Sequence, residues 1–254
     1  MKYHNLKAKL QNNELTLGSW ITIGHPAIIE ILSHAGFDWL TIDIEHTTID
    51  LTMTQNLIAT IQSYDMAALV RVSKNEEVVI KRVLDAGANG IIVPMVSTPE
   101  EAKRAVDYAK YPPLGKRGVG LNRAQKYGFG FQEYKKWVAD NLVVIAQIEH
   151  IDGIKNIDAI INTEGIDGVI IGPYDLSGSL GFPGDYNRAD VKEALKEFEA
   201  ACLKADKCMG FHVIEPDHTK IQEKIKEGYK FIAFSTDFLF MGGKATDEMK
   251  SIKR

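Results

Sequence analysis

Eight short runs of apolar, mostly β-branched residues recur along the chain, and stretches with helical periodicity lie between them. Parallel strands need long connections, which are usually helices, so this alternation predicts a parallel sheet joined by crossover helices. Eight strand–helix units in about 250 residues are the usual size of a (β/α)₈ barrel. We therefore predict an α/β fold, a (β/α)₈ TIM barrel that forms one domain over residues 1–254. The eight runs begin at Leu17, Trp39, Ala67, Gly90, Leu142, Gly168, Lys207 and Lys230.

The competing architecture is a doubly wound open sheet. That fold places a G-x-G-x-x-G motif after its first strand, and no such motif follows the first run here. Several of the helical stretches also end in glycine, as helix C-termini do. The clearest helical patterns cover residues 76–87, 98–110, 151–165 and 188–206.

Residues 111–140 interrupt the alternation, because this connection is longer than those between the other units. Its lysines fit a solvated surface excursion. Its glycines instead suit a mobile lid or a close approach of the backbone to a ligand. These glycines are Gly118, Gly120, Gly128 and Gly130.

Composition excludes several classes of protein. Hydrophobic residues make up 45% and charged residues 25% of the 254 positions, which are ordinary globular values. The formal charge of -4 gives no electrostatic case for binding nucleic acid or an anionic membrane. The apolar runs are far shorter than the roughly 20 residues that span a bilayer, and residues 1–15 lack the apolar core of a secretory signal. With only Cys202 and Cys208 present, we expect a cytoplasmic protein in a reducing compartment.

Ionisable and polar residues stand at the C-terminal ends of several predicted strands, where TIM barrels carry out their chemistry. We expect these side chains to converge on one mouth. They are Asp43, Glu45 and His46 on the second strand, Arg71 on the third, Gln147, Glu149 and His150 on the fifth, and Asp175 on the sixth.

Glu149 and Asp175 come from adjacent strands, so their carboxylates would repel each other if nothing lay between them. A divalent cation removes this conflict, and two carboxylates with remaining positions for water or substrate oxygens suit Mg²⁺ or Mn²⁺. Alternatively, each carboxylate caps a helix or pairs with a Lys or Arg. The matching positions on neighbouring strands favour the metal site.

His46 and Arg71 are the other candidates for chemistry. A neutral imidazole at a strand end can act as a general base near pH 7, although a lone His is more often a hydrogen-bonded structural residue. Arg71 interrupts an apolar run and would suit a carboxylate or a developing oxyanion. An internal salt bridge from Arg71 to Glu45 or Asp43 is the alternative.

A metal, a strand-end Arg and a His base together describe a class II aldolase site, which chelates a 2-oxo acid and stabilises its enolate. A class I aldolase would need a Lys at a strand end to form a Schiff base, and none of the eight runs provides one.

Five segments in order resemble the HpcH/HpaI aldolase family of metal-dependent pyruvate aldolases. The similarity extends from about Leu17 to Gly184 and more loosely to the C-terminus. The segments are AGFDWLTIDIEHTTID, LVRVSKNEEVVIKRVLDAGANGIIVPMVSTPEEAKRAV, YPPLGKRGVG, AQIEHIDGIKNIDAI and EGIDGVIIGPYDLSGSLGFPG.

The resemblance implies a role for particular residues. It places the metal ligands on Glu149 and Asp175, the catalytic histidine on His46 and the pyruvate-binding arginine on Arg71. It further implies that Asp85 orients the histidine, and that Gln147 and the backbone around Pro173 and Tyr174 contact the 2-oxo acid. The metal would be Mg²⁺ or Mn²⁺, with Co²⁺ or Zn²⁺ as alternatives. The family fold is a (β/α)₈ barrel of the phosphoenolpyruvate/pyruvate type, assembled as a homohexamer in which the last helix is exchanged between subunits.

The resulting hypothesis is the reversible cleavage of a 4-hydroxy-2-oxo acid, such as a 2-keto-3-deoxy sugar acid, to pyruvate and an aldehyde. Two alternatives remain: a CoA-thioester lyase of the citrate lyase β or malyl-CoA lyase type, and a barrel that binds a keto acid without turnover. The chain departs from the family at Tyr174, in FHVIEP, in FSTD and in LNRAQKYGFGFQEY. These positions are expected to line the aldehyde side of the pocket, so the sequence does not identify the aldehyde.

Overall fold

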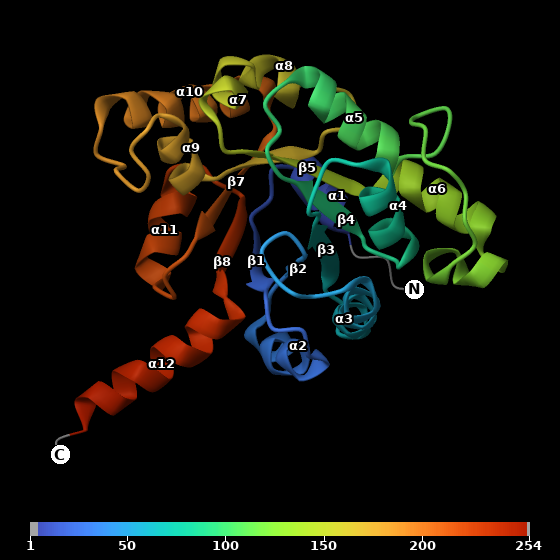
Figure 1. The fold of residues 1–254 in the computed structure, drawn as a ribbon, viewed down its shortest axis with the longest axis horizontal. Helices are drawn as coiled ribbons and strands as arrows, with labels where there is room; N and C mark the ends of the chain where they lie inside the picture. Colours follow the sequence, from blue (N-terminus) through green and yellow to red (C-terminus); the bar gives the residue numbers. More distant parts are fainter. Residues whose placement is uncertain (1–4, 253–254) are drawn as a thin grey trace.

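In the computed structural model, which describes residues 5–252, eight parallel strands close into a barrel in sequence order (Figure 1). This confirms the predicted (β/α)₈ barrel. The strands are β1 (Thr16–Ile21), β2 (Trp39–Asp43), β3 (Ala67–Arg71), β4 (Gly90–Val93), β5 (Val143–Ile148), β6 (Gly168–Ile171), β7 (Cys208–Val213) and β8 (Phe231–Thr236).

Helices surround the barrel, and each crossover brings the chain back to begin the next parallel strand. They are α1 (Leu6–Gln11), α2 (Pro26–Leu32), α3 (Leu51–Ser63), α4 (Glu77–Asp85), α5 (Pro99–Ala109), α6 (Phe131–Asn141), α7 (Ile151–Lys155), α8 (Ile157–Ile161), α9 (Pro173–Ser179), α10 (Ala189–Ala205), α11 (His218–Lys226) and α12 (Asp237–Ser251). Two 3₁₀ turns are η1 (Ser33–Ala35) and η2 (Arg123–Gly128).

The barrel interior is packed with large side chains. Trp39 of β2 stacks on Phe231 of β8 with ring centroids 4.2 Å apart. This packing requires a glycine on β1, because a Cβ at Gly18 would lie 2.1 Å from the Trp39 ring. Leu6 and Leu10 of α1 are buried in the same cluster, so α1 closes the N-terminal end of the barrel. The open end is therefore the C-terminal one.

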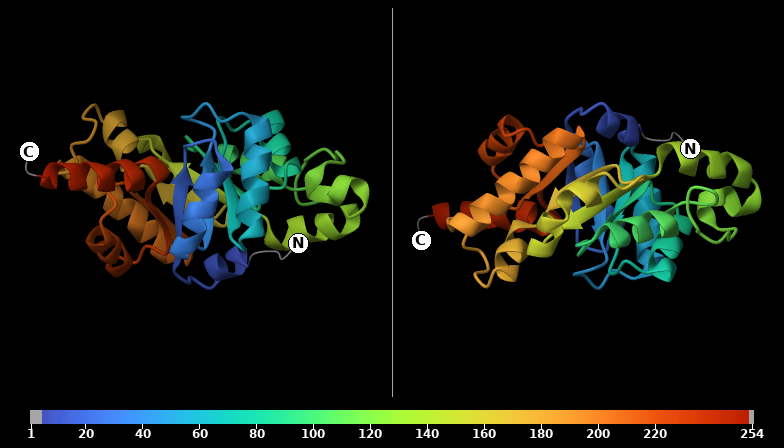
Figure 2. Two further views of the ribbon diagram at one scale, coloured as in Figure 1. Left: turned by 90° about the horizontal axis from the view of Figure 1, so that it is seen from below. Right: turned by 90° about the horizontal axis from the view of Figure 1, so that it is seen from above.

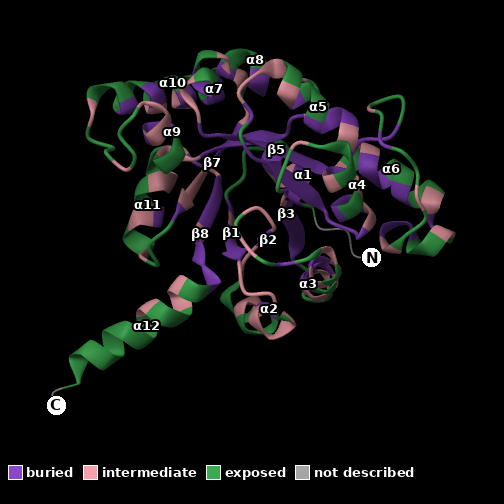
Figure 3. Ribbon diagram, viewed as in Figure 1, coloured by how far each residue is buried: buried purple, intermediate pink, exposed green. Residues whose placement is uncertain are grey.

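The outer helices bury one apolar face each against the strands. In α5, Pro99 occupies the first turn and the Thr98 hydroxyl accepts a hydrogen bond from the Glu101 N–H, which fixes where the helix begins. Its alanines and Val106 are buried, whereas Glu100, Lys103 and Arg104 are exposed. Figure 3 shows the same division, with buried strands inside a shell of half-buried and exposed helices.

Residues 111–140 are more ordered than the predicted lid, since they contain η2 and most of α6. Arg117 anchors this segment to the end of α4: its side chain is fully buried, and its guanidinium donates to the Asp85 carboxylate at 2.6 Å. Arg123 binds the Ala86 carbonyl at 3.0 Å in the same region. The prediction of a surface excursion or mobile lid was therefore wrong for residues 131–140, which lie in α6 and where Tyr134 and Trp137 are buried.

The single helix predicted over residues 151–165 is also wrong, because the structure divides it into α7 and α8. Asn156 stands between them, and its amide donates to the Ser97 carbonyl at 2.9 Å.

The last helix, α12, projects away from the barrel (Figures 1 and 2). Asp237 is the one residue of α12 that is buried, and Phe238 and Met241 are exposed although they are apolar. No helix within residues 5–252 is both long and apolar enough to cross a membrane.

Candidate functional site

A cavity of about 110 Å³ lies at the C-terminal ends of the strands. Of the residues that the sequence predicted to converge on one mouth, Arg71, Gln147 and Asp175 line this cavity. Trp20, Tyr174 and His212 line it as well.

Arg71 is held by Asp43 in a forked pair. Arg71 Nε donates to one carboxylate oxygen at 3.0 Å and Nη2 to the other at 2.6 Å, and Nε also lies 3.3 Å from Glu45 Oε2. The guanidinium stacks over Trp20 at 4.3 Å from the ring centroid. The internal salt bridge that the sequence left as an alternative therefore exists. It leaves the Nη1 donors of Arg71 without a hydrogen bond to any described residue, so the same side chain can still bind an oxyanion.

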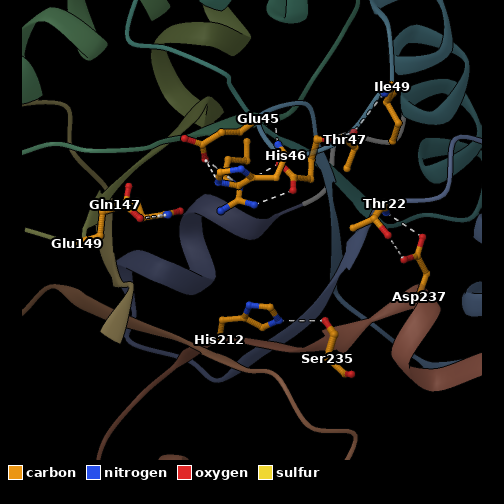
Figure 4. A network of polar contacts seen from close by, with 12 residues as sticks. Thr22, Glu45, His46, Thr47, Ile49, Gln147, Glu149, His212, Ser235 and Asp237 are labelled. Atoms are coloured by element: carbon orange, nitrogen blue, oxygen red, sulfur yellow. Dashed lines mark hydrogen bonds and ion pairs between the residues drawn. The ribbon is translucent and has the colours of Figure 1, made fainter. Parts of the chain in front are cut away.

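Glu45 and His46 lie beside this pair at the end of β2 (Figure 4). The Asp43 carboxylate accepts both of their backbone N–H groups, at 3.0 and 3.3 Å, and so fixes the turn. His46 is 70% exposed, with its Nε2 3.6 Å from Glu45 Oε2. Burial is the main reason that the pKa of Glu45 rises to about 7, with Glu149, Asp43 and Asp175 adding repulsion that Arg71 partly offsets.

Glu149 is buried at the end of β5, and both of its carboxylate oxygens accept a hydrogen bond. Gln147 Nε2 donates to one at 2.6 Å, as Figure 4 shows, and the Met95 N–H donates to the other at 2.7 Å. Met95 has a positive φ of 55°, which is uncommon for a residue other than glycine. The strained turn after β4 thus points a backbone donor at Glu149.

Gly172 brings Glu149 next to the cavity. A Cβ at Gly172 would lie 3.0 Å from Glu149 Cβ and 3.1 Å from its Oε2, so a larger residue would require Glu149 to shift. Asp175 follows in the first turn of α9 and lines the cavity. Burial raises the pKa of Glu149, and the negative charge of Asp175 raises it further.

The donor set suits a hard divalent cation. Glu149 and Asp175 repel each other across one site, and buried Gln147 Oε1 has no hydrogen-bond partner in the described chain. Carboxylate and amide oxygens are ligands that Mg²⁺ and Mn²⁺ accept, with water and substrate filling the remaining positions. Residues 5–252 contain no cluster of three or more His, Cys, Asp or Glu side chains placed to bind a metal.

Asp85 does not lie near His46 within one chain. α4 starts at the mouth after β3 and runs back toward the N-terminal end, so Asp85, its last residue, lies at the far end of the barrel. Its Oδ1 accepts hydrogen bonds from Arg117 at 2.6 Å and from Gln125 at 3.2 Å. Within the described chain Asp85 therefore pairs with Arg117 and Gln125 and not with His46, and its role in orienting the histidine stays a prediction.

Two other residues differ from what the sequence indicated. His150 caps α7 by accepting the Asp152 N–H at 3.1 Å, which is a structural role. His212, which gave no signal in the sequence, lines the cavity from β7. The alternation of inward and outward side chains along a barrel strand could have found it, since His212 lies one residue before the strand ends.

Residues 16–241 match the family model described as HpcH/HpaI aldolase/citrate lyase. A hydroxypyruvate/pyruvate aldolase of Roseobacter denitrificans is 35% identical over 239 residues, which cover 94% of this chain and 93% of that protein. A 5-keto-4-deoxy-D-glucarate aldolase of Salmonella paratyphi C is 36% identical over 235 residues, covering 92% and 91%.

A solved structure is similar along nearly the whole chain. The crystal structure of an HpcH/HpaI aldolase/citrate lyase family protein from Burkholderia cenocepacia superimposes with a TM-score of 0.89 at 32% identity. The match covers 98% of this chain and 100% of that one.

Proposed function

The chain belongs to the HpcH/HpaI aldolase/citrate lyase family, and we propose that it catalyses the reversible aldol cleavage of a 4-hydroxy-2-oxo acid to pyruvate and an aldehyde. The observation that carries the proposal is that Arg71 and Asp175 line one cavity, while buried Glu149, whose charge interacts with both of them, lies against Gly172 at its edge. Relatives of this similarity are named aldolases, which favours this reaction over cleavage of a CoA thioester.

Glu149 and Asp175 would hold the divalent metal, Mg²⁺ or Mn²⁺ by their oxygen donors, with Co²⁺ or Zn²⁺ as alternatives. When bound, such a cation supplies Lewis-acid polarisation of the 2-oxo acid. Gln147, with a free carbonyl oxygen, and the backbone of Pro173 and Tyr174 would orient the substrate.

Arg71 stabilises the enolate oxygen that develops as the bond between C3 and C4 breaks. The electron pair of that bond passes into the enolate. His46 takes the proton of the 4-hydroxyl group, directly or through water, and the aldehyde is formed at C4. Glu45, not Asp85, is the carboxylate beside the His46 ring. Protonation of C3 then gives pyruvate.

The test uses purified protein that has been treated with chelator and resupplied with Mg²⁺ or Mn²⁺. We expect metal-dependent exchange of solvent deuterium into the pyruvate methyl group, and new product when an aldehyde is added. Glu149→Gln should lower exchange at least roughly 100-fold, as loss of a metal ligand does. It should also abolish the rise in melting temperature that metal produces in the wild type. Exchange that is unaffected by chelator and by Glu149→Gln would overturn the proposal.

His46→Ala separates an enzyme from a barrel that only binds keto acid. Pyruvate should still bind in the presence of metal, while turnover with an aldehyde should be lost, because the role proposed for His46 is to move the proton and not to hold the 2-oxo acid. An unchanged rate would exclude His46 as the base.

We also assign α12 to the assembly. Ile28 and Ile31 of α2 and Phe240 and Met241 of α12 line a second, apolar cavity of about 530 Å³. An exposed apolar surface of this kind suits burial against another subunit, and a homohexamer with exchanged C-terminal helices supplies one. The cytoplasmic location remains a prediction, and the buried free thiols of Cys202 and Cys208 agree with it.

A further inference from the structure

His212 is a polar side chain of the cavity that the reaction described above does not use. It lies on β7, with its ring 5.4 Å from that of Trp20. Its Nε2 lies 3.2 Å from the Ser235 carbonyl oxygen, as Figure 4 shows. One nitrogen of the imidazole is therefore bound to β8, and the residue lines the cavity.

The backbone of β8 is shaped to make this contact. Ser235 has a positive φ of 53°, and the register between β1 and β8 shifts between Gly18 and Trp20. The Ser19 hydroxyl also donates to the Ser235 carbonyl, at 3.2 Å, and the Ser235 hydroxyl donates to the Ile214 carbonyl at 2.8 Å. Backbone in this region persists only when its surroundings hold it, so the position of the carbonyl is fixed.

This contact selects one tautomer of the ring. A carbonyl oxygen can only accept, so Nε2 must carry the hydrogen, and Nδ1 of a neutral ring must be an acceptor. The ring is neutral at pH 7, because burial is the main cause that lowers the pKa of His212 to about 4, and the Arg71 cation lowers it further. Nδ1 makes no hydrogen bond to any residue that the structure describes.

Nδ1 of His212, as an acceptor, can form a hydrogen bond only with a group of the ligand that carries a donor hydrogen. A carboxylate, a ketone or an aldehyde has none, whereas a hydroxyl group has one. We propose that His212 determines specificity by accepting, at Nδ1, a hydrogen bond from a hydroxyl group of the substrate, so that a hydroxylated 2-oxo acid or aldehyde is favoured over its deoxy analogue. The proposal rests on the proposed function. The hydroxyl belongs either to C3 of the 2-oxo acid, next to the carbon whose oxygen Arg71 stabilises, or to the aldehyde.

Two matched pairs of substrates distinguish these sources. The first pair compares hydroxypyruvate with pyruvate, measured by deuterium exchange at C3 and by titration calorimetry with Mg²⁺ present. The second pair compares glycolaldehyde with acetaldehyde as the partner of pyruvate, measured as kcat/KM. In the wild type, at least one pair should favour the hydroxylated member by roughly 10- to 100-fold, as expected where the deoxy ligand would displace water from an acceptor and leave it unpaired.

His212→Leu should reduce that preference to less than about threefold and leave the deoxy substrate within about threefold of the wild type. His212→Asn keeps an acceptor near the position of Nδ1 and should retain part of the preference, which also covers the case that the Leu variant fails to fold. The matched control is His34→Leu, an exposed histidine at the opposite end of the barrel, which should change neither pair.

The outcomes separate the two proposals. If the wild type exchanges the pyruvate methyl group but treats both members of each pair alike, the role of His212 is overturned and the aldolase assignment stands. The role of His212 is also overturned if His212→Leu keeps the wild-type preference for the hydroxylated substrate. If the wild type shows no metal-dependent exchange, the proposed function fails, and the role of His212 fails with it.

Discussion

Glu45 is the carboxyl group of the site with the clearest consequence for pH. Its pKa of about 7 in the metal-free protein lies above the ordinary value of 4.5, because burial and three neighbouring carboxylates disfavour its charge. A raised carboxyl pKa stabilises the fold fully below pH 4.5, and this stabilisation is lost as the pH rises through 7.

The side chain in Glu45→Gln cannot ionise, so the variant should not lose this stabilisation as the pH rises. The free energy of unfolding is measured with urea in the presence of chelator. Relative to the wild type, that of the variant should increase by up to about 3 kcal/mol between pH 4.5 and pH 8, at about 1.4 kcal/mol per pKa unit. Glu76→Gln, at a 60% exposed carboxylate, is the control and should show little change with pH. An equal difference in stability at both pH values would contradict the assignment.

Gly172 permits a second prediction for a single residue. Gly172→Ala pushes on the Glu149 carboxylate, since the new Cβ would lie 3.1 Å from its Oε2. We expect roughly 100-fold lower kcat/KM and a loss of about 1–3 kcal/mol in stability, from displacement of a catalytic group and overpacking. Gly178→Ala on the same helix is the matched control, because its Cβ would meet Pro183 at an ordinary 3.7 Å. Full activity in Gly172→Ala would show that this close approach has no functional role.

We expect Arg117 to hold residues 111–130 against the end of α4. Arg117→Met leaves the Asp85 carboxylate without its buried cation, which should cost about 3–5 kcal/mol. Hydrogen exchange of residues 118–130 should then become faster than in the wild type. Lys116→Met is the control: this neighbour is 78% exposed, and its loss should leave hydrogen exchange of the segment as in the wild type. Unchanged exchange in Arg117→Met would mean that other contacts hold the segment.

The strands could be predicted from the sequence because each is an apolar run with few alternatives, as in Gly90–Val93. Convergence of Arg71, Gln147 and Asp175 followed from the parallel order alone. Asp85 could not be placed this way, because the motif that suggests its role does not say at which end of a helix it lies. Nor does any local pattern reveal the His212 tautomer, which depends on a backbone carbonyl from another strand.

The projecting helix α12 allows the proposed assembly of subunits to be tested. Met241 is 60% exposed in a single chain, so Met241→Glu should leave the isolated fold intact but oppose burial against another subunit. Light scattering after size exclusion should show a smaller species than the wild type. Leu203→Glu, at a 69% exposed apolar position on α10, is the matched control and should leave the mass unchanged. A Met241→Glu variant with the mass of the wild type would remove α12 from the interface.

The position of α1 also has a kinetic meaning. Leu6 and Leu10 of α1 are buried at the N-terminal end of the barrel, so ligands reach the cavity from the C-terminal end. Glu149, which would hold the metal and through it the 2-oxo acid, is buried, so we expect the 2-oxo acid to bind deeper than the aldehyde. With this arrangement the 2-oxo acid should enter before the aldehyde in condensation and leave after it in cleavage.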